Sequence, residues 1–456
     1  MSHQKVVLLD GRGVGDDDLS PVLETLMDEL RSSGATVQTF PLKDIKMGSC
    51  IGCFSCWIKT PGLCVEPDAG RDIVQAIVQS DVTILFTPVT FGGYSSEIKK
   101  IQDRWIPLVL PDFCIHHGEV HHLPRYSHYP RLVGIGIQRQ PNDMEANLFN
   151  VLVGRNALNF HAPTYAAEVI LSTDRSDRVR QQLQKVLIRK DPFPVKKVVK
   201  SLMPMAESTT MTVPVMATPG RALLIVGSPR VKSSSSSGIL GGYVLEQLKQ
   251  RGWETESLTL RGHLLKGVGQ AKFLTTVDQA DLILFAFPLY IDSLPFLMMR
   301  SLEVMAKHLS AHSQESPKRL FAIANNGFPE AHHNALALAI CQQFALDTNM
   351  VWLGGLAVGA GTVVCQNPPV EGLRQAGRPP MKHGIQALDI VSASLAEGQS
   401  VPPKAAKLMA KTPIPLMLFS LWRWLFVTMA KWGWRRGAAI NQVGAKDLLA
   451  QPYGTV

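Results

Sequence analysis

The feature that most constrains the fold is an internal repeat, in which both halves of the chain follow the same order of segments. Each copy begins with a short apolar run, at 5–10 and 221–226, followed by a glycine-containing loop and a helix-like segment that ends in glycine. A second apolar run, at 81–88 and 281–288, is rich in the residues that favour strands buried on both faces. This alternation of strands and helices predicts two doubly wound parallel-sheet α/β domains.

The other strands of each copy follow from similar patterns. We expect second strands at 35–42 and 253–260, fourth strands at 131–137 and 319–325, and fifth strands at 162–171 and 350–359. Between the copies, five prolines and no lasting periodicity indicate a linker. The predicted organisation is a domain at 1–190, a linker at 191–220, a domain at 221–400 and a basic, tryptophan-rich helical extension at 401–456.

Composition and charge bound the class of protein. A chain of 456 residues with 46% apolar and 18% charged residues suits several globular domains. The first residues hold too short an apolar run for a signal peptide, so we expect a cytoplasmic protein. Residues 401–456 hold eight basic residues against one aspartate, a net charge of 8 − 1 = +7 of the total of +9. The remaining +2 argues against a nucleic-acid partner for the domains.

Four cysteines form a cluster in the first copy. Cys50, Cys53, Cys56 and Cys64 occupy the sequence CIGCFSCWIKTPGLC, inside an insertion that the second copy lacks. Thiols stay reduced in the cytoplasm, so clustered cysteines favour metal binding or redox chemistry over a disulfide. An iron–sulfur cluster, a zinc ion and free thiols remain alternatives at this point.

The loops after the first strands differ between the copies. The second copy has GSPRVKSSSSSG at 227–238, whose hydroxyls and backbone N–H groups at a helix start favour a phosphate group. The first copy has Asp16, Asp17 and Asp18 in the same place, which would repel a phosphate and which we expect to cap the helix. The sequence therefore predicts phosphate binding mainly in the second domain.

These loops resemble those of a known family. GSPR with its serines, FPLYIDSLP (287–295), NNGFPE (325–330) and TPVTFGGYSSEIKKIQDRW (87–105) are similar to the flavin-binding loops of the flavodoxin-like NADPH-dependent FMN reductases. The cysteine motif resembles that of the related iron–sulfur flavoproteins. The resemblance implies bound FMN, NAD(P)H as co-substrate and a four-iron four-sulfur cluster.

The resemblance also implies a set of binding residues. For the FMN phosphate they are Ser228, Arg230, Ser233 and Ser235. Beside the flavin ring they are Pro288, Leu289, Tyr290, Ile291, Asp292, Ser293, Asn325, Asn326, Gly327 and Phe328, with Pro88, Thr90, Phe91, Gly92, Gly93 and Tyr94 as the first-copy counterparts. For the metal they are Cys50, Cys53, Cys56 and Cys64. No catalytic side chain is assigned, because the flavin carries the chemistry.

The expected function is an FMN-dependent oxidoreductase that passes electrons from NAD(P)H to a small acceptor such as a quinone or a flavin. The alternative is a flavodoxin-like electron carrier or an interaction protein that docks to a membrane, with a redox protein as partner. A homo-oligomer is a further expectation that the sequence neither requires nor excludes.

Two further segments are candidates for a metal-binding or membrane-contact site. Five histidines occur between 116 and 128, which we interpret as a polar loop or a domain-contact surface rather than a metal site. Residues 413–436 hold four of the eight tryptophans. Two prolines and a central arginine argue against a membrane span, and we expect a helix docked on the domains, with peripheral membrane contact as the alternative.

Overall fold

The computed structural model describes residues 4–203, 219–230, 235–311, 316–361, 382–411 and 418–454. The chain divides into two compact units. Unit 1 comprises Met1–Val195 and Trp424–Val456, and unit 2 comprises Lys196–Arg423.

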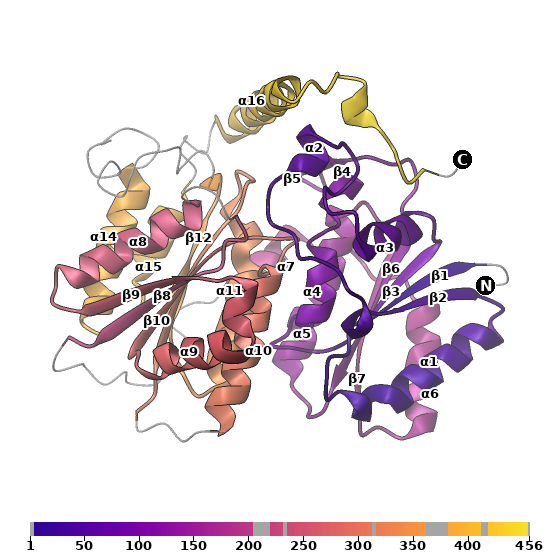
Figure 1. Cartoon of the computed structure of the whole chain (residues 1–456), viewed down its shortest axis with the longest axis horizontal. Coiled ribbons are helices and arrows are strands. Elements are labelled where there is room, and N and C mark those ends of the chain that lie inside the picture. The colour runs from indigo at the N-terminus through magenta and orange to yellow at the C-terminus, as the bar shows by residue number, and fades with distance from the viewer. Residues whose placement is uncertain are drawn as a thin grey trace. The chain divides into compact units, whose positions relative to one another are not determined.

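Unit 1 is built on a parallel sheet of five strands in the order β2-β1-β3-β6-β7 (Figure 1). The strands are β1 (Lys5–Asp10), β2 (Thr36–Pro41), β3 (Val82–Pro88), β6 (Arg131–Gln138) and β7 (Tyr165–Leu171). Every residue of β3 is buried, as its unbroken apolar run predicts for the central strand of a sheet that is covered on both faces.

Helices cover this sheet on both faces. The helices of residues 4–195 are η1 (Asp17–Leu19), α1 (Ser20–Ser32), η2 (Leu42–Asp44), α2 (Ser55–Ile58), α3 (Ala69–Val78), α4 (Ser96–Gln102), η3 (Ile106–Leu108), α5 (Asp143–Asn159) and α6 (Ser176–Ile188). On one face, apolar side chains of α1 and α6, among them Leu26 and Leu183, form one core with Leu8 and Ile84 of the sheet. Such burial of one helix face is the main source of helix stability in a protein.

The histidine-rich segment is not the polar loop that we expected. It forms an antiparallel hairpin of β4 (Val109–His116) and β5 (Glu119–Pro124). His121 is fully buried, and the ring of His122 lies against Trp57 and Phe113. Alternating side chains of a hairpin point to opposite faces, so polar residues can enter an interior that composition alone would not predict.

Unit 2 repeats the topology in the order β12-β11-β10-β8-β9. Its strands are β8 (Arg221–Val226), β9 (Glu254–Thr259), β10 (Leu282–Pro288), β11 (Arg319–Asn325) and β12 (Val351–Val358). Its helices are α7 (Lys196–Ser201), α8 (Ser236–Lys249), η5 (Gly262–Leu265), α9 (Gly267–Asp278), α10 (Phe296–Ala311), η6 (Ala331–Asn334), α11 (Ala335–Asp347), α14 (Lys382–Ala396) and α15 (Pro403–Met409). Numbered within each unit, both sheets have the order 2-1-3-4-5, which confirms the predicted pair of doubly wound α/β folds.

The unit boundaries differ from those expected. Residues 196–201 of the expected linker are helical, and 204–218 lie outside the described residues. The expected extension is divided, because α15 packs into the core of unit 2 and the residues from 424 onward belong to unit 1. The last elements are α16 (Phe419–Ile440) and η8 (Asp447–Leu449). None of the described helices is long and apolar enough to cross a lipid bilayer.

Candidate functional site

The four clustered cysteines line one pocket of unit 1. The pocket lies in the insertion between η2 and α3, and its empty volume, open solvent included, is about 420 Å³. Its lining residues are Ser49, Cys50, Ile51, Cys53, Phe54, Cys56, Cys64, Val65, Glu66, Asp103, Arg104, Ile106 and Pro107. The structure thus brings together all four cysteines that the sequence marked as candidate ligands.

Left-handed backbone positions fold the loop back on itself. Gly52, Phe54 and Gly62 have φ angles of 64°, 54° and 83°. Phe54 is a bulky residue in a region that such residues rarely adopt, a type of strain that is concentrated at functional sites. A Cβ atom at Gly62 would lie 2.5 Å from Pro452, so glycine is required there by crowding as well as by conformation.

Arg104 holds the two ends of the cysteine loop together. Its side chain is 1% exposed and pairs with Asp68, which is also the N-cap of α3. It also donates hydrogen bonds to the carbonyl oxygens of Gly48 and Glu66, at 3.2 and 3.1 Å. Burial alone would raise the pKa of Asp68, but hydrogen bonds from the Gly48 N–H and from Arg104 hold it below its usual value. The carboxylate is therefore charged and fixes the base of the loop.

Aromatic side chains form the outer wall of the loop. The indole N–H of Trp57 donates to the carbonyl oxygens of Ile106 and Val109, at 3.1 and 2.9 Å. Its ring lies 4.7 Å from His122 and 5.0 Å from Trp434 of α16, measured between ring centroids. These contacts fix the residue that follows Cys56, and with it the direction of the α2 turn.

Burial favours the neutral form of two thiols of the pocket, Cys50 and Cys56. Cys53 is exposed, whereas burial raises the pKa of Cys50 to about 12, and burial also raises the pKa of Cys56 well above its usual value. A hydrogen bond from the Gly52 backbone acts in the opposite direction on Cys50. The pocket gathers four sulfur donors, the donor set of zinc and iron–sulfur sites, and is also lined by Glu66 and Asp103.

The last residues of unit 1 cover the cysteine loop, which the sequence did not indicate. Arg125, only 3% exposed, donates to the carbonyl oxygens of Leu448 and Ala450, at 2.9 and 2.8 Å. The side chain of Gln451 returns a hydrogen bond of 2.6 Å to the Arg125 carbonyl. Tyr453 is 5% exposed, and burial raises its pKa to about 12.

In unit 2, the predicted phosphate-binding residues lie at the carboxyl end of β8 and at the start of α8. Ser228 is buried and Arg230 is exposed. The hydroxyl of Ser235 caps α8 by accepting from the Gly238 N–H at 3.0 Å. The hydroxyl of Ser237 donates to Asn325 at the end of β11, at 2.7 Å. The predicted Ser233 lies outside the described residues.

The ring-side loops of the two copies have the same geometry. In unit 2, Tyr290 and Ser293 exchange backbone hydrogen bonds of 2.9 and 3.1 Å across a two-residue turn. In unit 1, Thr90 and Gly93 do the same at 3.0 and 2.8 Å. The turn residues have positive φ angles, namely Ile291 (50°), Asp292 (57°), Phe91 (53°) and Gly92 (78°). A β-branched residue such as Ile291 rarely adopts this conformation, which makes the turn of unit 2 a candidate ligand clamp.

The other predicted ring-side residues flank these turns. The β10–β11 register pairs Pro288 with Asn325, and the Leu289 N–H donates to the Asn325 carbonyl at 2.7 Å. Asn326 donates from its side chain to the Glu330 carbonyl at 3.0 Å, which closes the loop that carries Gly327 and Phe328. In unit 1, Pro88 and Tyr94 are buried, and the Tyr94 hydroxyl donates to Asn156.

The acidic loop of unit 1 does not cap its helix as we expected. Helix α1 has Leu19 at its N-cap, and no side chain caps η1. Asp16 and Asp18 instead pair with Arg139, at 2.7 and 2.8 Å, because this guanidinium lies across both carboxylates. A carboxylate oxygen of Asp16 also accepts the Gly13 N–H at 2.7 Å, so an acid of the chain itself takes a backbone donor of this loop.

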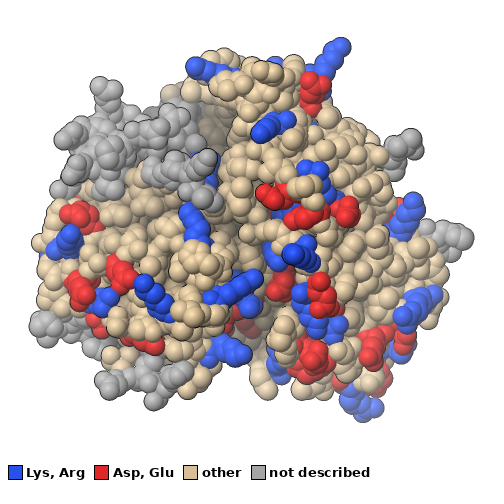
Figure 2. Space-filling model, viewed as in Figure 1, with Lys and Arg blue, Asp and Glu red and all other residues tan. Residues whose placement is uncertain are grey.

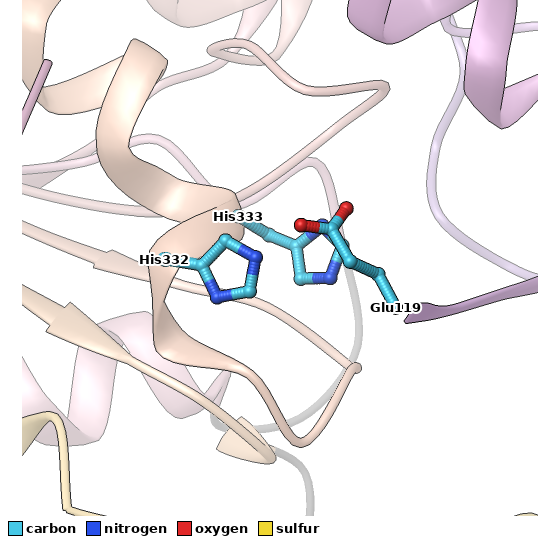
Figure 3. Close-up of side chains that lie close together, drawn as sticks. All are labelled: Glu119, His332 and His333. Carbon is cyan, nitrogen blue, oxygen red and sulfur yellow. The ribbon is translucent and has the colours of Figure 1, made fainter. Parts of the chain in front are cut away.

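Other polar residues were missed in the sequence. Figure 3 shows Glu119, at the start of β5 in unit 1, and His332 and His333, adjacent in η6 of unit 2. Within unit 1, Glu119 pairs with Arg155, and both side chains are almost fully buried. Within unit 2, the rings of His332 and His333 stack at 4.8 Å between centroids. The sequence analysis did not single out His332 and His333, whose adjacency in the chain was their only signal.

A family model matches the part of the chain that carries the four clustered cysteines. Residues 20–112 match the family model of the NADPH-dependent FMN reductases. This part of the chain resembles that family. An iron–sulfur flavoprotein of Methanocaldococcus jannaschii is 29% identical over 104 residues, which are 23% of this chain and 53% of that protein. An iron–sulfur flavoprotein of Archaeoglobus fulgidus is 31% identical over 88 residues, or 19% of this chain and 39% of that protein.

The matched stretch thus spans about half of the first relative and less of the second. Among solved structures, the NAD(P)H:quinone oxidoreductase from Methanothermobacter marburgensis aligns with 42% of this chain and 99% of its own, at 13% identity and a TM-score of 0.32. That similarity is too weak to carry an argument. The resemblance to FMN reductases and iron–sulfur flavoproteins is confirmed by the family and sequence matches.

Proposed function

We propose that the protein is an FMN-dependent NAD(P)H oxidoreductase with a four-iron four-sulfur cluster in unit 1 and FMN in unit 2. The observation that carries the proposal is that all four clustered cysteines line one pocket. That pocket belongs to a unit whose sheet has the strand order 2-1-3-4-5. Two relatives of the chain are iron–sulfur flavoproteins, which supports the presence of both kinds of cofactor in the protein. The acceptor that we propose is a small molecule such as a quinone or a flavin.

A cluster rather than zinc is the proposed occupant because two relatives of the chain are iron–sulfur flavoproteins. A loop fixed at its base by Arg104 would keep the four thiols around the volume of a multi-iron cluster.

The fit to FMN rests on unit 2. When bound there, FMN would supply hydride acceptance from NAD(P)H and electron release to an acceptor. The start of α8 would bind the phosphate, because its first N–H groups and the helix dipole favour an anion. The turn between Tyr290 and Ser293 would contact the ring. In unit 1, by contrast, the carboxylate of Asp16 already accepts the Gly13 N–H, which disfavours a phosphate in that loop.

The first test is analysis of the full chain after anaerobic purification. We expect iron and sulfide, flavin absorbance near 450 nm as for oxidised FMN proteins in general, and steady NAD(P)H oxidation with a small quinone. Cys56→Ser should abolish iron binding, and Cys114→Ser, outside the pocket, should not. Protein free of iron and flavin after reconstitution would refute the proposal. Reduction only by another protein would instead show an electron carrier.

A second test places FMN in unit 2. Ser235→Asp keeps an efficient N-cap for α8 but puts a negative charge at the proposed phosphate site. We expect at least tenfold weaker FMN binding with little change in stability, whereas Ser235→Thr should bind FMN nearly normally. Equal affinity of Ser235→Asp and the unsubstituted protein would place the phosphate elsewhere.

A further inference from the structure

Helix α16 has an apolar face that points away from the unit it is docked on. On its inner face Phe426 is 7% and Ala438 1% exposed, and Phe426 packs on Phe113 at 5.5 Å between ring centroids. The outer face carries large apolar side chains that are largely exposed, namely Leu421 (57%), Trp424 (64%), Leu425 (39%), Met429 (59%) and Trp432 (65%). The helix therefore packs on the protein through its inner face and leaves an apolar outer face exposed.

The spacing of these five residues makes a continuous stripe. Trp424 and Leu425 are adjacent and the other neighbours lie three or four residues apart, so over about three helical turns all five share one side of the helix. A helix docked on a globular protein normally turns polar residues outward, and exposed apolar patches mark interaction surfaces. The outer face of α16 is instead apolar.

The charged residues of α16 itself are all positive. Residues 419–440 contain no aspartate or glutamate, and Lys431, Arg435 and Arg436 are exposed at the C-terminal end of the stripe. The Arg436 guanidinium lies over the Trp432 ring, 5.4 Å from its centroid. In Figure 2, by contrast, basic and acidic side chains are interspersed over much of the face in view. The partner of this helix should therefore be apolar inside and negatively charged at its surface.

We propose that α16 is an interfacial anchor that binds the surface of an anionic lipid bilayer. Leucine, methionine and the two tryptophans of the stripe would enter the headgroup and upper acyl region, and the three basic residues would contact lipid phosphates. Tryptophan favours this interface because its ring is apolar and its N–H can reach water. The helix would lie in the plane of the membrane surface, because no described helix can cross it.

The same observations disfavour the two other occupants. A second copy would offer these basic residues no opposite charge on α16, because a two-fold interface pairs each surface with itself and the helix has no acidic residue. A groove on a partner protein would have to match the shape of this stripe and also carry negative charge beside it. An anionic bilayer satisfies both the apolar stripe and the charges without a specific shape.

The test is co-sedimentation of the full chain with vesicles of phosphatidylcholine alone or with 30% phosphatidylglycerol. We expect binding to the anionic vesicles only, at least tenfold weaker in 0.5 M salt than in 0.1 M salt, because salt screens surface charge. The double variant Trp424→Ser/Trp432→Ser should bind at least tenfold more weakly. A matched control is Val268→Ser/Ile188→Ser, which changes two apolar side chains that are 88% and 72% exposed elsewhere.

Folding and insertion can be checked separately. Circular dichroism melts of both double variants should match the unsubstituted protein, because the four side chains lie largely in solvent. Brominated lipids should quench tryptophan fluorescence of the unsubstituted protein and not that of Trp424→Ser/Trp432→Ser. Vesicle binding that is unaffected by the tryptophan substitutions would overturn the proposal. So would a dimer in vesicle-free solution that these substitutions dissociate.

Discussion

At the scale of single residues, the cysteines were predictable and the groups that position them were not. Four cysteines in fifteen residues signal a soft-metal or redox site wherever the loop lies. Arg104 gave no such signal, because its partner Asp68 is 36 residues away and the pair forms only when α4 and the insertion pack together. Pairing of side chains across a fold depends on tertiary structure, which a local pattern does not contain.

Arg104 is expected to control both stability and cofactor loading. Arg104→Met keeps much of the side-chain volume but removes the buried guanidinium that donates to Asp68 and to two carbonyl oxygens, a loss that costs about 3 kcal/mol. We expect a lower free energy of unfolding in urea and lower iron content.

A matched control for this change is Arg31→Met. Arg31 pairs with Asp28, but both side chains are more than half exposed, so the loss should stay below about 0.5 kcal/mol. Equal losses for the two variants would contradict the role of Arg104 in the cysteine loop.

At the scale of elements, the strands and most of the helices followed the sequence closely. Buried parallel strands such as β3 and β10 are unbroken apolar runs, and their glycine-bounded helices have helical spacing, so each was predictable from its own residues. The β4–β5 hairpin was missed because its histidines and glutamate concealed the strand pattern. The tail over the cysteine loop was missed because its contacts are made with residues far away in the chain.

The tail is expected to protect the cysteine loop from solvent. Ending the chain after residue 445 removes the acceptors of Arg125 and the side chain of Tyr453. We expect faster hydrogen exchange in the backbone of residues 50–64, measured by mass spectrometry, and unchanged exchange in strands β8 and β10. Unchanged exchange in residues 50–64 would show that the tail has no such role.

The hairpin is expected to lose stability in acid. Burial lowers the pKa of His122 to about 3, against an ordinary value of 6.5. Between these two values the unfolded chain binds a proton that the folded chain does not, so stability falls as the pH falls from 6.5 toward 3. Each pH unit costs at most about 1.4 kcal/mol.

Replacing the ring by an apolar one isolates this effect. His122→Phe keeps an aromatic ring between Trp57 and Phe113 but cannot be protonated. Its thermal midpoint should fall less than that of the unsubstituted protein between pH 7 and 5, whereas His128→Phe, at an exposed position, should behave as the unsubstituted protein does. A parallel loss in both variants would exclude His122 as the acid-sensitive group.

At the scale of the whole molecule, the internal repeat predicted two sheets of one topology, and the structure shows how the copies diverged. The acids of the first copy pair with Arg139, whereas the second copy keeps serines at the same place. The cysteine insertion is present in the first copy alone. The two units therefore share one fold, and short loops distinguish their proposed roles.

This divergence predicts the cofactor content of each chain. We expect one FMN rather than two, because only the loop of unit 2 lacks the acids, and four irons with four sulfides, because one pocket holds all four cysteines. Acid extraction with flavin chromatography, and iron and sulfide assays on the same sample, measure these ratios. Two flavins per chain would show that unit 1 binds FMN despite Asp16 and Asp18.

The position of the tail also sets an order of events during synthesis. Gln79, close to the cysteine loop in sequence, and Tyr453, which hydrogen-bonds to it through its carbonyl, are 374 residues apart. At roughly 5–20 residues per second, a ribosome needs about 20–75 s to travel from one to the other. The cysteines are thus made long before the residues that cover them, which leaves the nascent chain an interval in which the proposed cluster would be assembled in an open loop.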